Sequence, residues 1–117
     1  MPGVSIHVVD VSRGVLAVWM EVAFYALHGG APRLIARGAT SDRGLLEAEA
    51  LGATFPAGSY RAVFQVGAYY RAAGVPQPAV PFLDAVTYDF AIADPRQHYH
   101  LPFKCTPWGY SCFRGGA

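Results

Sequence analysis

The sequence predicts an all-β protein, an antiparallel sandwich of short strands in one domain that spans residues 1–117. A chain of this length is typical of one compact domain, and 53% apolar against 15% charged residues supply enough apolar surface for a core. Thirteen Gly and nine Pro provide turn formers along the whole chain. Between them lie about eight stretches with the length and composition of strands, which is typical of an antiparallel sandwich.

The first half of the chain is predicted to consist of strands and turns. Residues 4–10 predict a strand whose side chains alternate between two faces. One face carries Val4, Ile6 and Val8, and the other carries Ser5, His7 and Val9. After a break at residues 12–14, residues 17–27 are rich in Val, Trp, Phe and Tyr and predict a longer strand. Short strands are expected over residues 33–39 and around 44–46, on either side of a polar turn.

The second half contains the one predicted helix. Residues 60–66 alternate and predict another strand. Residues 68–73 carry helix-forming Ala and Arg and end at Gly74, with Pro76 just beyond, a combination that stops a short helix. The remaining strands are predicted over residues 82–92, 97–105 and 109–114.

The charge and hydropathy of the chain indicate which classes of partner it can bind. The formal net charge of +1 supplies no field that would attract nucleic acid or an anionic membrane surface. A mean hydropathy of +0.24 at so low a charge indicates apolar surface buried between subunits, so we expect an oligomer. The start of the chain lacks the features of a signal peptide, and no stretch approaches the roughly 20 apolar residues of a membrane span. We therefore expect a cytoplasmic protein.

The two cysteines, Cys105 and Cys112, are too few for a disulfide framework. In a reducing compartment such residues are usually small, partly buried thiols. Neither has an adjacent His in the sequence that would activate it as a nucleophile, so we expect packing thiols.

A histidine cluster is the most informative local feature. In a strand, His98 and His100 point to one face and Tyr99 points to the other. With His7 on the polar face of the first strand, the fold could bring three imidazoles together for proton transfer near neutral pH. Spacing alone leaves two alternatives open, surface histidines without a function and a metal site with His7 as third ligand. No Cys, Asp or Glu at a fixed spacing supports the metal.

Other catalytic motifs are weak or missing. Gly109-Tyr110-Ser111 lacks the second Gly of a serine-hydrolase turn. No glycine-rich phosphate loop occurs, so we expect no nucleotide cofactor. Arg114 lies between the ring of Phe113 and two glycines, an arrangement that lets the backbone approach a planar polar ligand closely. A frayed tail would explain the same residues.

Five segments form a recognisable pattern. They are Ile-His-Val-Val-Asp-Val-Ser-Arg-Gly at 6–14, Phe-Gln-Val-Gly-Ala-Tyr at 64–69, Ala-Asp-Pro at 93–95, His-Tyr-His-Leu-Pro at 98–102 and Thr-Pro-Trp-Gly-Tyr-Ser at 106–111. Together they resemble the 5-hydroxyisourate hydrolases of the transthyretin-like family. The resemblance covers nearly the whole chain, and the last two segments are specific signals in matching order and separation.

The resemblance implies a fold and an activity. The implied fold is a transthyretin-like sandwich of two four-stranded antiparallel sheets with one short helix, assembled as a homotetramer with active sites in a channel between two dimers. The implied reaction belongs to purine catabolism and uses no cofactor or metal. Water attacks a ring carbonyl of 5-hydroxyisourate and the ring amide C–N bond opens. A His would activate the water, and an Arg would stabilise the oxyanion.

Carried over residue by residue, the resemblance assigns catalytic roles to His7 and His100, with His98 as a neighbour. Which His is the general base stays open. The family's Arg follows Thr-x-x-Asp-Gly, whereas here Arg43 precedes the glycine and Leu45 follows it. We expect Arg43 to reach the site through a shortened turn. With an ungapped alignment, Leu45 would take that position instead.

The terminal signature of the family also differs in this chain. Tyr-Arg-Gly-Ser reads Phe113-Arg114-Gly115-Gly116 here, followed by Ala117. Two hydroxyls are therefore missing, each worth about 1–3 kcal/mol if it binds substrate. The residues that the resemblance assigns to substrate binding are His98, Ser111, Phe113, Arg114 and Gly116.

Two further residues depart from the family. Lys104 shares the strand face of His98 and His100, where it puts a charge in the channel or at the contact between dimers. Trp19 stands where a Gly is usual, and we expect it to remodel a turn.

Three functions compete on this evidence. The first is a 5-hydroxyisourate hydrolase, which His7, His100 and Arg114 favour. The second is an enzyme of the same fold that acts on another small heterocycle or cyclic amide, which the missing hydroxyls and Lys104 favour. The third is a ligand-binding protein without catalysis, which the retained histidines disfavour.

Overall fold

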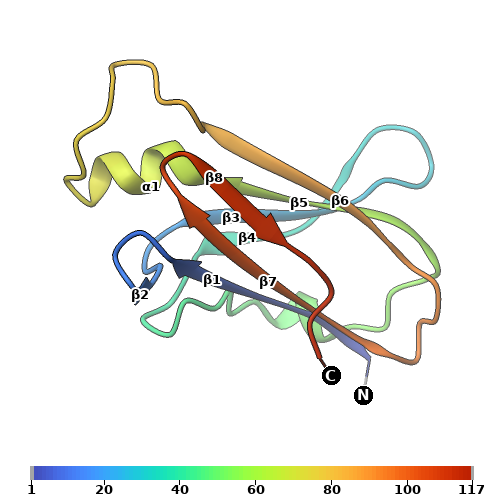
Figure 1. Cartoon of the computed structure of the whole chain (residues 1–117). Helices are drawn as coiled ribbons and strands as arrows, with labels where there is room; N and C mark the ends of the chain where they lie inside the picture. The colour runs from blue at the N-terminus through green and yellow to red at the C-terminus, as the bar shows by residue number, and fades with distance from the viewer. Residues whose placement is uncertain (1, 117) are drawn as a thin grey trace.

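The computed structural model describes residues 2–116 and has the predicted sandwich of two four-stranded sheets (Figure 1). One sheet has the strand order β2 (Val15–Leu16), β1 (Gly3–Asp10), β7 (His98–Thr106) and β8 (Gly109–Cys112). The other has the order β4 (Arg33–Ala39), β3 (Glu21–Ala26), β5 (Gly58–Gln65) and β6 (Ala85–Ile92). The predicted helix is α1 (Val66–Ala72), which follows β5 directly. Ala117 lies outside the described residues.

One pair of strands contradicts the expectation that both sheets are antiparallel. β1 and β7 run parallel, from the pair Gly3 and His98 to the pair Asp10 and Cys105. Parallel neighbours need a long connection, and here most of the chain lies between the two strands. Side-chain alternation predicts which face a residue occupies but not the direction of the neighbouring strand, so this pairing could not be foreseen.

The predicted long strand over residues 17–27 is shorter than expected, because only its second half forms β3. The side chain of Thr40 forms hydrogen bonds with backbone groups of the segment just before β3. Its hydroxyl accepts a hydrogen bond from the amide of Met20 at 2.9 Å and donates one to the carbonyl of Ala17 at 2.7 Å. Thr40 is buried, so these bonds are protected from water and hold the chain in a bend before β3 begins.

Smaller differences lie at the ends of the other elements. Three ends differ from the predicted ranges. The helix α1 begins earlier, at Val66, β6 begins later, at Ala85, and β8 ends earlier, at Cys112. A 3-10 helix, η1 (Glu49–Gly52), was not predicted because one turn is too short to show a hydrophobic period. The short strand expected around residues 44–46 is reduced to a bridge between Leu45 and His7.

Aromatic side chains on the inner faces join the two sheets. Phe64 of β5 stacks on Phe103 of β7 with 3.8 Å between the ring centroids, and both are fully buried. Phe24 of β3 stacks on Tyr60 of β5 in the same core. Because the odd-numbered residues of β7 are anchored in this core, its even-numbered residues His98 and His100 face outward.

Both cysteines are free thiols. Burial raises the pKa of each thiol, Cys105 and Cys112, to about 11. Both sulfurs therefore stay protonated at neutral pH, where a thiol is a poor nucleophile. No helix within residues 2–116 is long and apolar enough to cross a membrane.

A buried carboxylate ties the helix to the first sheet. Asp10, the last residue of β1, is fully buried and accepts hydrogen bonds from Tyr70 at 2.7 Å and Tyr69 at 3.0 Å, both on α1. It also accepts bonds from Ser12 at 2.7 Å and from the guanidinium of Arg13 at 2.8 Å. Burial alone would raise the pKa of Asp10, but these hydrogen bonds outweigh burial and hold the pKa below 3.8.

Replacing this carboxylate should destabilise the fold. Asp10→Asn keeps the size of the side chain but removes the charge that Arg13 and the two tyrosines bind, and should lower the free energy of unfolding by about 3 kcal/mol. The loss should be full above pH 3.8 and shrink as the pH falls through the lowered pKa of Asp10, because the wild-type carboxylate is then protonated.

Urea denaturation across this pH range measures the effect. Asp42→Asn, in an exposed turn, is the matched control and should change stability by less than about 0.5 kcal/mol. Equal losses in the two variants would contradict the stabilising role of Asp10.

Candidate active site

The predicted histidines lie on β1 and β7, the two strands that run side by side in the first sheet (Figure 1). Partners in a parallel ladder share a face, and the register sets Ser5 opposite His100 and His7 opposite Pro102. His98 lies opposite Gly3 at the start of the same ladder. The three imidazoles are half-buried, so they are held by neighbours on one side and open to a ligand on the other.

Hydrogen bonds connect this cluster. The hydroxyl oxygen of Ser5 lies 2.6 Å from Nδ1 of His100 and 2.8 Å from Nε2 of His98. The ring of His7 is tilted by 31° to that of His100, with 6.4 Å between the centroids. The structure therefore brings together all three histidines that the sequence singled out. It adds a serine between two of them.

The electrostatics of the cluster favour a neutral His100. Burial lowers its pKa below the ordinary 6.5, and the neighbouring rings of His7 and His98 lower it further because they can carry positive charge. A neutral imidazole keeps a lone pair on one ring nitrogen. His100 can therefore accept a proton near neutral pH, as a general base must.

The turn that contains Arg43 runs beside His7. Leu45 is the bridge partner of His7, and the amide of Val8 donates to the carbonyl of Gly44 at 2.8 Å. Opposed residues share a face, so the side chain of Leu45 lies on the face of His7. Arg43 is in the turn itself and forms a 3.2 Å ion pair with Glu47, in which both side chains are largely exposed.

Only glycine fits at Gly44. Its φ is +71°, and a Cβ at this position would lie 2.6 Å from the carbonyl oxygen of Val8. The glycine lets the turn approach β1 closely enough for the bridge between Leu45 and His7.

The C-terminal tail lies against the histidines. The amide of Gly115 donates to the carbonyl of His100 at 2.7 Å, and a Cβ on Gly115 would lie 2.8 Å from Cδ2 of that ring. Arg114 donates to the side chain of Gln97 at 3.0 Å and to the carbonyl of His98 at 3.2 Å. Its guanidinium stacks 3.8 Å above the centre of the Tyr99 ring. Arg114 and Gly115 therefore pack against β7, and these contacts contradict the alternative of a frayed end for the two residues.

The remaining sequence candidates lie on β7, on β8 and in the tail. Lys104 is exposed on the outer face of β7, as its position in the strand predicted, and its ammonium lies 5.6 Å from the centre of the Phe113 ring. Ser111 is exposed and pairs with Lys104 across β7 and β8. Gly116 is exposed, and a Cβ added to it would have no atom within 4 Å.

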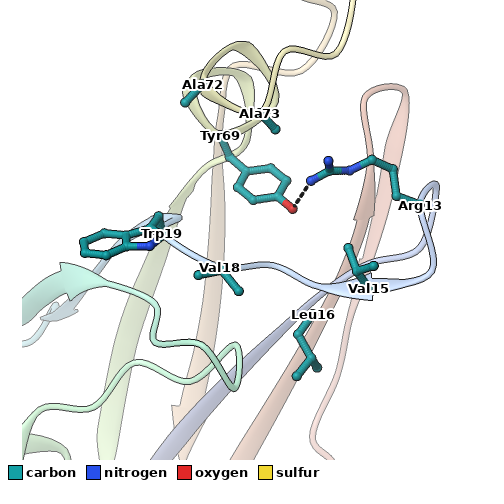
Figure 2. Close-up of a pocket in the computed structure, with 8 residues that line it drawn as sticks. All are labelled: Arg13, Val15, Leu16, Val18, Trp19, Tyr69, Ala72 and Ala73. Atoms are coloured by element: carbon teal, nitrogen blue, oxygen red, sulfur yellow. Dashed lines mark hydrogen bonds between the residues drawn. The ribbon is translucent and has the colours of Figure 1, made fainter.

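A separate pocket of about 570 Å³ lies between α1 and the loop after β1, away from the histidines (Figure 2). Figure 2 shows Tyr69 from α1 bonded to Arg13 at one side and Trp19 at another. The φ angle of Trp19 is +69°. Within residues 2–116, it is the only residue other than glycine that has a positive φ. Trp19 therefore adopts the left-handed backbone that favours glycine, and the remodelling of this turn stays a prediction.

A metal centre finds no support among the described residues. Within residues 2–116, no group of three or more His, Cys, Asp or Glu side chains is placed to hold a metal ion. One ring nitrogen of His98 and one of His100 instead contact the hydroxyl of Ser5.

Two residues of the site were missed in the sequence. Ser5 was placed on the face of His7 by its alternation, but its contacts depend on the parallel register with β7. The steric role of Gly115 depends on where the tail folds back, which no local pattern indicates.

The chain is similar to known proteins over nearly its whole length. The HIUase/Transthyretin family matches residues 4–115. The chain is 40% identical to 5-hydroxyisourate hydrolase 2 of Rhizobium meliloti (strain 1021), over 93% of this chain and 92% of that protein. It is 38% identical to 5-hydroxyisourate hydrolase of Ralstonia nicotianae, over 98% of this chain and 99% of that protein.

Solved structures have the same fold. The structure of Klebsiella pneumoniae 5-hydroxyisourate hydrolase superposes with a TM-score of 0.81 at 30% identity, over 99% of this chain and 100% of that one. The crystal structure of (S)-allantoin synthase superposes with a TM-score of 0.90 at 32% identity, over 97% of this chain. This chain spans only 43% of that protein. The fold, the near-complete match of residues 4–115 and these identities establish that the chain belongs to the HIUase/Transthyretin family.

Proposed function

We propose that this protein is a 5-hydroxyisourate hydrolase that works without a cofactor. The observation that carries this function is the cluster of Ser5, His7, His98 and His100 on one open sheet face. The cluster includes an imidazole whose pKa is lowered by burial, which suits a general base at neutral pH. Relatives named 5-hydroxyisourate hydrolase, similar over nearly their whole length, support the same substrate.

In the proposed reaction, His100 or His7 takes a proton from water while the water oxygen bonds to a ring carbonyl carbon of 5-hydroxyisourate. The intermediate carries negative charge on the former carbonyl oxygen. Its C–N bond then breaks, and the imidazolium returns the proton to the departing ring nitrogen. The ring opens to a carboxylic acid, which releases its proton to solvent and becomes a carboxylate, and the neutral imidazole is restored. This is a step of urate degradation.

Two arginines are proposed to bind the polar groups of the substrate. Arg43 would stabilise the oxyanion. Its ion pair with Glu47 is exposed and therefore weakened by water, so an anionic intermediate can compete for the guanidinium. Arg114 is stacked and hydrogen-bonded beside His98, which suits a planar ligand. His98, Ser111, Phe113 and Gly116 complete the proposed binding residues.

We also propose a cytoplasmic homotetramer with active sites in the channel between dimers. The support is the open histidine face of one chain, which a second copy would enclose. Several apolar side chains on or beside the first sheet are exposed, namely Val11, Val15, Trp108, Tyr110 and Phe113. The free thiols of Cys105 and Cys112 fit the reducing cytoplasm.

A related function has one specific observation in its favour. Phe113 and Gly116 lack the hydroxyls of the family's terminal signature, and Lys104 adds a charge beside Phe113. These changes favour an enzyme of the same mechanism that acts on another small heterocycle or cyclic amide. A ligand-binding protein without catalysis would not need the base that His100 provides.

The first prediction from this proposed function tests the hydrolase directly. Urate and urate oxidase generate 5-hydroxyisourate in place, and loss of its near-ultraviolet absorbance should be faster when micromolar protein is added. His7→Ala and His100→Ala should each lower kcat by about 10²–10⁴-fold, because a general base contributes that much. His28→Ala, an exposed loop histidine, is the control and should leave kcat unchanged. No acceleration by wild-type protein, or acceleration that survives both substitutions, would contradict the proposal.

The second prediction concerns the missing hydroxyls. The double variant Phe113→Tyr, Gly116→Ser should raise kcat/KM for 5-hydroxyisourate by at least about 30-fold, because it restores two hydroxyls and each is worth about 1–3 kcal/mol. Gly116 has open space for the serine. Phe82→Tyr adds a hydroxyl to another exposed ring and should change nothing. A slow wild type that the double variant does not improve would favour a different heterocycle as substrate.

The third prediction concerns the contact of the tail with His100. Gly115→Ala puts a Cβ 2.8 Å from Cδ2 of His100 and 3.2 Å from the ring of Pro102, so the imidazole or the tail must move. Because a shift of about 1 Å at a catalytic group can cost about 10²-fold, kcat should fall at least about tenfold. Gly52→Ala, where a Cβ meets open space, is the matched control. Equal kcat values for the two variants would show that the tail does not position His100.

A further inference from the structure

The hydroxyl of Ser5 links two imidazoles into a continuous chain of hydrogen bonds. Its oxygen lies 2.6 Å from Nδ1 of His100 and 2.8 Å from Nε2 of His98. The other ring nitrogen of His98, Nδ1, lies 3.3 Å from the carbonyl oxygen of Pro2. The chain therefore runs from Pro2 through His98 and Ser5 to His100, and it begins at a group that can only accept.

The direction of each bond follows from that starting point. A carbonyl oxygen has no proton to donate, so Nδ1 of His98 carries the proton and donates to Pro2. In a neutral imidazole the second nitrogen then accepts, so Nε2 of His98 receives the O–H of Ser5. The serine has only one proton, and it is directed at His98. Its oxygen must accept the bond to His100, so Nδ1 of His100 is the donor.

We propose that Ser5 is a positioning residue that holds His100 in the tautomer protonated at Nδ1, which leaves Nε2 free as the base that takes the proton from water. This inference rests on the proposed hydrolase function. An imidazole without such a partner divides its proton between the two nitrogens. Part of the population would then present an N–H where the reaction needs a lone pair.

The surroundings of His100 keep its ring neutral, and a neutral ring can exist in either of two tautomers. Burial and the neighbouring His7 and His98 lower its pKa, so the ring is neutral near neutral pH and has a tautomer to select. Two further cationic side chains are Lys104, on the same face of β7, and Arg114, which bonds to the carbonyl of His98. Neither donates a hydrogen bond to the ring among the contacts of residues 2–116.

The position of Ser5 is itself well determined. Its neighbours Val4 and Ile6 are buried in the core, and its ladder partner is His100. A serine on a strand so anchored has little freedom to leave the two rings.

Nuclear magnetic resonance of the ¹⁵N-labelled full-length protein tests the proton positions. Long-range ¹H–¹⁵N correlations distinguish protonated from unprotonated ring nitrogens in each histidine. At about pH 8, well above the ordinary pKa of imidazole, His98 and His100 should both be protonated at Nδ1. In Ser5→Ala, the His100 pattern should shift towards protonation at Nε2. Ser5→Thr keeps the hydroxyl and should restore the wild-type pattern.

Kinetics test the consequence for the reaction. Ser5→Ala should lower kcat at least about tenfold with little change in KM, because the substrate contacts remain while the base is misdirected. Ser5→Thr should recover most of the activity. Ser59→Ala, an exposed serine on β5 in the other sheet, is the matched control and should match the wild type in both measurements.

The outcomes separate this inference from the proposed function. A wild-type spectrum with His100 protonated at Nε2 overturns the inference and needs no variant to fold. A correct spectrum with undiminished kcat in Ser5→Ala overturns the positioning role while the hydrolase function stands. A correct spectrum in a protein that does not hydrolyse 5-hydroxyisourate leaves the hydrogen-bond chain intact and rejects the proposed substrate.

Discussion

The parallel pairing of β1 with β7 is the interaction on which the rest of the site depends. It sets Ser5 opposite His100 and places His7 two residues further along β1, so that two strands from opposite ends of the chain bring the histidines to one face. The inner faces of the same strands bury Ile6, Val8 and Phe103 in the core. A slip of one residue would turn the imidazoles inward and these apolar groups outward, so burial of the core enforces the register of the histidines.

Close backbone approaches on both sides of this strand pair complete the site. On the side of β1, Gly44 lets a turn come within hydrogen-bonding distance of Val8 and sets Leu45 beside His7. On the side of β7, Gly115 lets the tail lie against His100. At Gly44 the approach requires both a positive φ and the absence of a Cβ, whereas at Gly115 it requires only the absence of a Cβ. The two glycines thus serve the same purpose for different physical reasons.

Particular residues show how far prediction from the sequence reached. His98 and His100 were placed on one face because side chains in a strand alternate, and His7 was placed on a polar face for the same reason. Arg43 could not be placed, because a turn with the glycine shifted by one residue has more than one geometry. In the structure Leu45 is opposite His7 and Arg43 pairs with Glu47, so the oxyanion role of Arg43 stays a proposal. Asp10 was missed because a buried carboxylate has no local signature.

The sequence by itself determined the sandwich, the approximate strands, the family resemblance and the faces of the histidines, because turn residues and side-chain alternation are local properties of the chain. Tertiary structure decided the direction of the β1–β7 pair, the contacts of Ser5 and the docking of the tail. These depend on which strands become neighbours and in what register, and residues about 95 positions apart in the chain, such as Ser5 and His100, meet only when a shared core is buried.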